Sequence, residues 1–237
     1  MILILLMKFD TPLIKTKFIK RYKRFFVDVL LNKEILTAHC PNSGSMMGLL
    51  NEGEYAWISE SKNTERKLKY TLEILENNKQ KVGVNTHLTN RIIEEALINK
   101  NIKELENFDQ VQREVKFNSN TRFDFLVSNK KEQAFVEVKN VTLKRENDCA
   151  EFPDAPTTRG QKHLLELINA KKKEYQAYLI FLIQREDCNF FKISKDIDKK
   201  YYENFIQAKK KGVKFLCYSS KVTDKEIILK NKIEIKF

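Results

Sequence analysis

Hydrophobic and polar residues alternate along two neighbouring stretches in the second half of the chain. Residues 121–127 (TRFDFLV) and 134–139 (AFVEVK) have the two-residue period of β-strands, and the polar residues 129–132 between them predict a turn. Because successive side chains of a strand point to opposite faces, the apolar ones are expected to share one face. These are Phe123, Phe125, Val127, Ala134, Val136 and Val138. The pattern therefore predicts a hairpin whose second face carries polar groups.

The length of the turn fixes which polar groups meet. If residues 129–132 form the loop, Ser128 pairs with Gln133, and counting outward places Asp124 opposite Glu137, with Cβ atoms within about 5.5 Å. Lys139 lies two residues beyond Glu137 and shares its face. A slip of one residue in the turn would put Asp124 and Glu137 on opposite faces.

Two carboxylates at this separation repel each other unless a cation lies between them. Oxygen ligands suit Mg²⁺ or Mn²⁺, and Asp124 and Glu137 are the expected metal ligands. A lysine beside such a site, here Lys139, can orient an attacking water or hold a phosphate. The alternative is an exposed cross-strand ion-pair ladder that contributes about 0.2–1 kcal/mol and needs no function. The Glu-x-Lys tripeptide alone is weak evidence, since it also begins at Glu65, Glu114 and Glu234.

The hydrophobic pattern changes near residue 84. Between residues 8 and 82 it consists of short apolar runs separated by turn residues, which predicts a small antiparallel barrel or meander. We therefore expect two domains, residues 1–83 and 84–237. The strand-like end, residues 226–237, could pair with either domain.

The second domain is expected to be a mixed α/β unit. Asn90 is suited to cap a helix, which is followed by three strands and by a second helix that begins at Thr158. A strongly apolar strand at residues 178–183 and a helix near 198–211 complete the order. Helix, three strands, helix, strand is typical of a sheet covered by helices.

Composition favours a polyanionic partner. The 237 residues include 44 Lys plus Arg against 32 Asp plus Glu, a formal net charge of +12. Nucleic acid is favoured over a membrane, since the sequence has no basic amphipathic helix and no apolar span. The four cysteines are scattered without metal-binding spacing, so we expect buried, reduced thiols in a cytoplasmic protein. The apolar residues 1–7 lack a basic flank and a cleavage site, and are expected to be a first strand or an extension ahead of Met7.

The predicted order of elements resembles a known nuclease core. A helix with a glutamate, a strand, a strand with Asp and a strand with Glu-x-Lys is the arrangement of the PD-(D/E)xK nuclease superfamily, although Phe123 stands where the motif often has Pro. Longer strings are similar to the sugar fermentation stimulation protein family, SfsA. They are RYKRFFVDV at 21–29, HCPNSGSMMGL at 39–49, VGVNTHLTN at 82–90, FVEVKNVTL at 135–143 and EFPDAPTTRGQKHLLEL at 151–167.

The resemblance implies an N-terminal OB-like antiparallel β-barrel joined to a C-terminal PD-(D/E)xK nuclease-like α/β domain, with DNA binding as the family's attributed activity. It also implies a further carboxylate from the helix after Asn90. Periodicity places Glu94 and Glu95 equally well beside the apolar stripe of that helix, and the family pattern favours Glu95 as a third metal ligand.

The start of the helix at Thr158 has two interpretations. Thr158 and Gln161 have the spacing of a capping box, yet Gln161 could instead point to the metal site, as in related nucleases, and it is kept among the catalytic candidates. Arg159, Lys162 and His163 lie in the first turn, where cations are unfavourable unless an anion joins them, so we assign them to nucleic-acid binding. Asp154 is expected to be a turn former or an extra ligand.

The barrel has its own candidates for nucleic-acid contact. Cations interleaved with aromatic residues near residue 22 suggest a single-strand binding surface, although the aromatic residues fit a core equally well. The turn that follows Pro41 could hold a phosphate through its backbone N–H groups. The candidates are Arg21, Tyr22, Lys23, Arg24, Asn42, Ser43, Arg66 and Lys67.

Three functions compete at this point. The first is a Mg²⁺- or Mn²⁺-dependent nuclease acting on DNA or RNA. The second is a non-catalytic DNA-binding regulator of sugar (maltose) metabolism genes, which would have no need of an anionic cluster and lacks a recognisable helix-turn-helix. A sugar-pathway enzyme is the third and the least supported, because no glycine-rich nucleotide loop or glycosidase carboxylate pair can be assigned.

Overall fold

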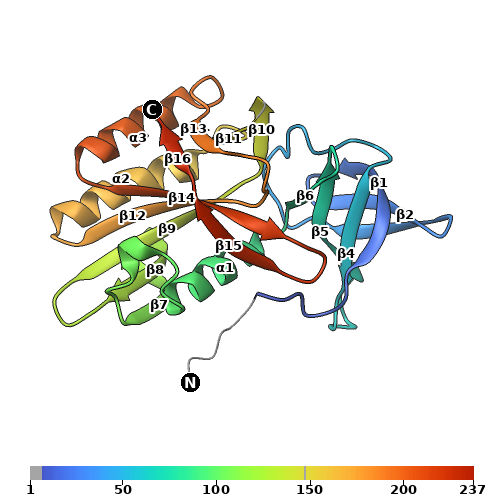
Figure 1. Ribbon diagram of the computed structural model, residues 1–237, viewed down its shortest axis with the longest axis horizontal. Coiled ribbons are helices and arrows are strands. Elements are labelled where there is room, and N and C mark those ends of the chain that lie inside the picture. The colour runs from blue at the N-terminus through green and yellow to red at the C-terminus, as the bar shows by residue number, and fades with distance from the viewer. Residues whose placement is uncertain (1–6, 147) are drawn as a thin grey trace.

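The computed structural model describes residues 7–146 and 148–237, so the prediction for residues 1–6 falls outside it. The chain forms a β-barrel at one end of the molecule and a larger α/β domain at the other (Figure 1). The boundary between them falls between the last barrel strand, which ends at Gly83, and the first helix, which begins at His87.

Five strands close the barrel. The sheet order is β3-β2-β1-β4-β5-β6. A short parallel pairing of β3 with β5 closes the ring of β1 to β5, and β6 extends the sheet beyond β5 as a sixth strand. The strands are β1 (Ile14–Tyr22), β2 (Phe26–Leu31), β3 (Glu34–His39), β4 (Tyr55–Glu60), β5 (Tyr70–Asn77) and β6 (Gln80–Gly83). Closure leaves only short free edges, which suits a domain of this size.

Tight hairpin turns set the register of the barrel. Asn32 and Lys33 between β2 and β3, and Asn78 and Lys79 between β5 and β6, all have positive φ. A two-residue turn with both φ values positive matches the right-handed twist of the flanking strands. Asparagine tolerates this conformation better than most residues, which explains its place at the first position of both turns.

The α/β domain is a six-stranded mixed sheet with helices on both faces. Its order is β15-β14-β12-β9-β8-β7, with β9, β12 and β14 parallel to one another. A second sheet, β10-β11-β13-β16, lies beside it. The strands are β7 (Gln110–Asn118), β8 (Thr121–Ser128), β9 (Gln133–Val141), β10 (Leu143–Glu146), β11 (Cys149–Phe152), β12 (Gln176–Ile183), β13 (Phe190–Ile193), β14 (Lys214–Val222), β15 (Ile227–Lys232) and β16 (Glu234–Lys236).

Three α-helices cover the two faces of the larger sheet. α1 (His87–Ile98) packs on one face, while α2 (Thr158–Lys172) and α3 (Lys199–Lys210) pack on the other (Figure 1). A short 3-10 helix, Lys103–Leu105, follows α1. The sheet therefore separates two hydrophobic cores, and a third core fills the barrel. The central strand β12 is buried along nearly its whole length, as expected for a strand covered on both faces.

The C-terminal segment joins the α/β domain. β15 pairs with β14 and β16 pairs with β13, so both halves of the strand-like end lie there. The chain start reaches the same edge, because the backbone N–H of Ile227 donates to the carbonyl of Met7 at 3.2 Å. The four cysteines are buried and free of disulfides. In residues 7–146 and 148–237 no helix is long and apolar enough to cross a membrane.

A buried arginine ties the two domains together. Arg185 is 1 % exposed and makes a bidentate pair with Asp187, with nitrogen–oxygen distances of 2.6 and 2.8 Å. It also donates to the carbonyl of Thr142 and to Oδ1 of Asn77 on the barrel strand β5, both at 3.1 Å. A planar guanidinium is suited to hold several fixed acceptors at once.

Replacing Arg185 with Met should destabilise the protein by about 1–3 kcal/mol, because the change removes the donor of the buried Thr142 carbonyl and of Asn77 and leaves Asp187 paired with Lys144 alone among the described cations. Urea unfolding would measure the loss. Arg113→Met is the matched control, since Arg113 makes only an exposed pair with Glu94 at 3.2 Å and should cost less than about 1 kcal/mol. Equal effects of the two changes would refute this role of Arg185.

Candidate active site

The hairpin register is the predicted one over its paired length. Ser128 pairs with Gln133, and the ladder runs on to the pair of Phe125 and Val136. Asp124 lies one residue beyond that pair, at the point where β8 leaves β9. Its Oδ2 accepts a hydrogen bond from the backbone N–H of Val138 at 2.7 Å. The Asp124 carboxylate therefore takes the place of a strand partner.

The single polar face expected for the hairpin is not formed. Phe125 belongs to the core beneath α1, whereas Phe123 packs in the core beneath α2, with its ring 5.1 Å from that of Phe135. The alternation thus breaks at Asp124, and across the sheet Glu114 has a φ of 52°. The second face is also covered by α2 instead of facing solvent, so Glu137 is buried.

Glu137 is the charged centre of the site. It is 2 % exposed, and its Oε1 contacts Nζ of Lys139 at 2.6 Å and Nδ1 of His163. Its Oε2 is buried and has no hydrogen-bond partner among the described residues. Burial alone would raise the pKa of Glu137, but Lys139 and His163 outweigh it and hold that pKa below its usual value.

Asp124 has the opposite electrostatic character. Burial, followed by repulsion from Glu137, raises its pKa from 3.8 to about 6, against the opposing effects of the Val138 N–H and Lys139. Its Oδ1 accepts from Nδ2 of Asn90 at 2.9 Å. A pair of carboxylates whose pKa values are pushed apart is characteristic of functional sites.

His163 belongs to this centre and not to the surface, which corrects its assignment to nucleic-acid binding. It lies on α2, is 6 % exposed and directs its ring at Glu137. Nearby, the hydroxyl of the fully buried Tyr201 likewise lacks a partner in the part of the chain that the structure describes. A Cβ on Gly160 would come within 3.1 Å of the Tyr201 ring, so glycine there lets α2 approach α3 closely.

The helix α1 contributes an amide to the site and not a carboxylate. Asn90 was expected to cap the helix, but α1 begins at His87 and Asn90 donates to Asp124 from within it. Glu95, the expected third ligand, instead accepts a hydrogen bond from the backbone of Met7, and burial raises its pKa. Glu94 pairs with Arg113. Helical periodicity identified the two glutamates as candidates, but Asn90 lies slightly more than one turn earlier and reaches the sheet.

The predicted capping box at Thr158 is displaced by one residue. Thr157 is the N-cap, and its hydroxyl accepts from the N–H of Gly160 at 3.0 Å. Gln161 does not reach the carboxylates. Its Nε2 donates to both oxygens of Asp198 at 2.9 and 3.0 Å, and Asp198 caps α3. Gln161 therefore couples the starts of the two helices.

Several barrel candidates are engaged in holding a loop. The guanidinium of Arg21 donates to four backbone carbonyls, among them those of Asn42 at 2.7 Å and Gly44 at 2.9 Å. The Asn42 side chain bonds Val84 and Gly44. Both side chains are therefore engaged within the protein, and their contact with nucleic acid stays a prediction.

Of the remaining barrel candidates, two are engaged within the protein and four are exposed. Tyr22 donates to Asp28 at 3.1 Å, and Arg66 donates to the Thr71 hydroxyl at 2.9 Å. Residues still exposed for a partner are Lys23, Arg24, Ser43 and Lys67. Lys23 and Arg24 have positive φ at the tip of the β1–β2 hairpin, which projects from the barrel.

Asp154 is neither an isolated turn former nor part of the carboxylate centre. Its Oδ2 accepts from the N–H of Met46 at 3.0 Å, and its carbonyl accepts from the Ser45 hydroxyl at 2.7 Å. A Cβ on Gly44 would lie 2.6 Å from the same carboxylate, so this loop needs glycine there. Asp154 thus docks the barrel loop on the α/β domain.

A basic groove lies beside the first turn of α2. It has a volume of about 550 Å³, and its lining includes Arg122, Arg159, Lys162 and His163. Lys162 donates to the carbonyl of Asn120 at 2.7 Å, and the three cations of the groove are exposed. His163 lines the groove and also contacts Glu137, so one side chain separates the groove from the carboxylate centre. Arg122 follows the β7–β8 turn, and only the folded arrangement brings it to α2.

Comparison with known families identifies the chain. Residues 87–226 match the model of the sugar fermentation stimulation protein RE domain, and residues 19–84 match that of the SfsA N-terminal OB domain. The chain belongs to the SfsA family. Two relatives are named sugar fermentation stimulation protein homolog. The one from Pelagibacter ubique is 58 % identical over 97 % of this chain and 99 % of the relative. The one from Maricaulis maris is 41 % identical over 97 % of this chain and 98 % of the relative.

A solved SfsA structure supports the same assignment. It is that of Pyrococcus furiosus SfsA in complex with Ca²⁺, with 27 % identity, a TM-score of 0.89 and coverage of 98 % of this chain and 99 % of the other. The predicted architecture of an OB-like barrel followed by an α/β domain is confirmed for this SfsA-family chain.

The carboxylate centre of the SfsA-family chain is chemically suited to a cation. Among the described residues no group of three or more His, Cys, Asp and Glu side chains is arranged to hold a metal ion. Two of the centre's features nevertheless fit one: Glu137 has a buried oxygen without a partner, and its repulsion helps to raise the pKa of Asp124. A divalent ion bound by two carboxylates would use the free oxygen and relieve the repulsion, with water completing its coordination.

The contribution of Asp124 to the stability of the metal-free protein should fall as the pH rises from about 4 to about 6. The pKa of Asp124 is raised from its ordinary value of 3.8 to about 6 by folding, so over this range the folded state retains a proton that the unfolded state has released. In EDTA, Asp124→Asn should remove this loss and be up to about 3 kcal/mol more stable than the native chain above pH 6. Urea unfolding between pH 4 and 7.5 measures it.

Asp109→Asn serves as the control, because Asp109 makes only an exposed pair with Lys100 at 3.1 Å. Its stability should follow the native chain across the pH range. If the stability of Asp124→Asn also followed that of the native chain at every pH, the charged form of Asp124 would not destabilise the folded protein at neutral pH.

Proposed function

We propose that this protein is a nuclease that depends on Mg²⁺ or Mn²⁺ and hydrolyses phosphodiester bonds of DNA or RNA. The observation that carries the proposal is the buried centre of Asp124, Glu137 and Lys139, in which one Glu137 oxygen has no partner among the described residues. Burying a carboxylate without satisfying both oxygens costs free energy, which function can explain and stability alone cannot.

Asp124 and Glu137 are the residues that would hold the metal. When bound, such a metal lowers the pKa of a water and neutralises charge on the phosphate. Lys139 is 14 % exposed at its side chain and 2.6 Å from Glu137, so its ammonium can turn from Glu137 towards a phosphate oxygen. In that position it stabilises the negative charge that develops on the phosphate.

Two further side chains position the carboxylates. Asn90 donates to Asp124, and His163 contacts Glu137 on the oxygen that Lys139 also uses. When Lys139 turns to a substrate, His163 remains to hold Glu137 in place. Such supporting contacts fix the orientation of metal ligands.

The relatives agree with a divalent metal. The Pyrococcus furiosus SfsA structure is a complex with Ca²⁺, an ion that shares the preference of Mg²⁺ for oxygen ligands. The matched OB domain and the net charge of +12 favour a nucleic acid as partner. The groove of Arg122, Arg159 and Lys162 offers three exposed cations to its phosphate backbone, on the far side of His163 from Glu137.

Purified protein should cleave labelled DNA or RNA in Mg²⁺ or Mn²⁺ and not in EDTA. Assays on single- and double-stranded forms of each polymer would define the substrate. Asp124→Ala and Lys139→Ala should each lower the cleavage rate at least about 100-fold, as expected for groups that act on developing charge. Glu94→Gln and Glu95→Gln should leave the rate within about threefold, since both side chains are engaged away from the centre.

Binding of nucleic acid without cleavage under every metal would overturn the proposal and favour the DNA-binding regulator. Cleavage that persists in both alanine variants would also overturn it, because the activity would then come from elsewhere or from a contaminant.

The groove beside α2 can be tested by the salt dependence of nucleic-acid binding. The triple change Arg122→Gln, Arg159→Gln and Lys162→Gln should reduce the slope of log K against log salt by about 2–3, since each lost phosphate contact removes about 0.7–0.9. Lys199→Gln, Lys209→Gln and Lys210→Gln carry the same charge change on exposed positions of α3. Equal slopes for the two triple variants would contradict a specific role of the groove.

A further inference from the structure

A second cavity lies on the other side of the start of α2, at the junction of the two domains. Its volume is about 240 Å³, just below the roughly 300–1,000 Å³ of sites for drug-sized ligands. Thr157 lines this cavity and Thr158, the next residue, lines the basic groove. Consecutive residues at the start of α2 therefore line the two openings.

The cavity differs from the groove in charge. In a chain with 44 Lys and Arg, no basic residue is part of its described lining. Two acids, Glu151 and Asp154, line it, and Glu151 is already paired with Arg145 and Lys192. An anionic group such as phosphate is disfavoured here, and a neutral polar group is favoured.

Polar groups remain free inside it. Thr142 is 6 % exposed, lines the cavity, and its hydroxyl makes no hydrogen bond to any described residue. The Nδ2 of Asn140 and the Oδ1 of Asp154 are likewise uncommitted within residues 7–146 and 148–237, while the Oδ1 of Asn140 and the Oδ2 of Asp154 already accept hydrogen bonds. Donors and an acceptor are thus available together, as recognition of a heterocycle edge requires.

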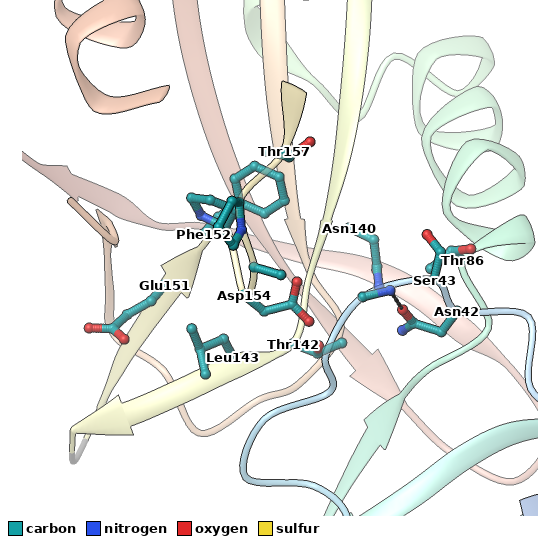
Figure 2. A pocket seen from close by; sticks show the side chains of 14 residues that line it. Asn42, Ser43, Thr86, Asn140, Thr142, Leu143, Glu151, Phe152, Asp154 and Thr157 are labelled. Atoms are coloured by element: carbon teal, nitrogen blue, oxygen red, sulfur yellow. Dashed lines mark hydrogen bonds between the residues drawn. The ribbon is translucent and has the colours of Figure 1, made fainter. Parts of the chain in front are cut away.

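An apolar wall faces these polar groups. Leu143, Phe152 and Pro153 line the cavity. Figure 2 shows the Asp154 carboxylate between the Phe152 ring and the loop that carries Asn42 and Ser43. A flat ring could pack on this wall while its edge meets Asn140, Thr142 and Asp154, in the way that flipped or unstacked bases are held.

The cavity is also close to the proposed cleavage centre along the chain. Asn140 directly follows Lys139 on β9, so the two backbones adjoin while their side chains point to opposite faces of the sheet, Lys139 towards α2 and Asn140 towards Gln184. The cavity opens at the carboxyl end of β9, between the starts of α1 and α2, where Thr86 and Thr157 line it. Ligands of α/β sheets bind outside the carboxyl ends of parallel strands where helices lie on opposite faces.

We propose that this cavity holds the nucleoside, base and sugar, next to the phosphate that is cleaved, so that the enzyme acts on an unstacked or terminal nucleotide. The proposal rests on the nuclease function, whose phosphate it places at Glu137 and Lys139, and it adds recognition of a neutral nucleoside by Thr142, Asn140 and Asp154. The same site should then prefer single-stranded or frayed ends over a closed duplex.

The test measures the binding of neutral deoxynucleosides to the full chain. Binding is detected by ligand-observed NMR in the presence of EDTA. Thr142→Val removes the free hydroxyl at constant shape and should weaken binding about three- to tenfold, the loss expected for one neutral hydrogen bond. Ala155→Phe, which fills the cavity from its half-buried wall, should abolish it. Thr64→Val, an exposed threonine in the β4–β5 loop, should bind as the native chain does.

The readout separates this proposal from the nuclease function. Nucleoside binding that is weakened in Thr142→Val and abolished in Ala155→Phe supports the cavity even if no metal yields cleavage. Cleavage without nucleoside binding, and unchanged in Thr142→Val, would overturn the cavity and leave the nuclease. Binding of free glucose or inorganic phosphate, but of no nucleoside, would overturn it as well.

Discussion

The interaction on which the site depends is the burial of Glu137 between a sheet and a helix. Burial to 2 % exposure favours the neutral form of a carboxylate, and here Lys139 from the same strand and His163 from α2 keep Glu137 charged. Each of these groups has a further consequence. Glu137 repels Asp124 and helps to raise its pKa, and this repulsion makes the pair a site for a cation.

The fold explains why the charge is placed there. β9 lies inside the larger sheet, with β8 on one side and β12 on the other, and helices cover both faces. β8 separates from β9 beyond Phe125, and the separation gives the Asp124 carboxylate access to the backbone of Val138. The start of α2 then lies between a basic groove and a neutral polar cavity. One helix end thus separates the proposed surface for a phosphate backbone from the proposed space for a nucleoside.

Local sequence patterns predicted the features of the fold that depend on residues close together in the chain. Alternation over 121–139 gave the strands and the pairing of Ser128 with Gln133, because the turn fixes the register. It could not show that Phe123 changes face, since the twist that moves it depends on packing under α2. The apolar runs did not reveal β1 (Ile14–Tyr22) either. Its lysines are interspersed among the few apolar residues of the strand, so no apolar run stands out.

Contacts between distant segments were the least predictable. Composition made Arg21 and His163 look like nucleic-acid ligands, yet the first holds a barrel loop and the second lies on Glu137. Asn90 was identified as a cap because its sequence context allows one, and only the packing of α1 against the sheet reveals its bond to Asp124. Similarly, Arg122 becomes a groove residue only once the β7–β8 turn reaches α2.

The most direct measurement of the central claim is a titration of Mn²⁺ into EDTA-stripped protein, followed by electron paramagnetic resonance. We expect one tight site per chain that is lost in Glu137→Gln and retained in Glu95→Gln. Unchanged Mn²⁺ binding in Glu137→Gln, or loss of the site only in Glu95→Gln, would contradict the assignment of Asp124 and Glu137 as the metal ligands.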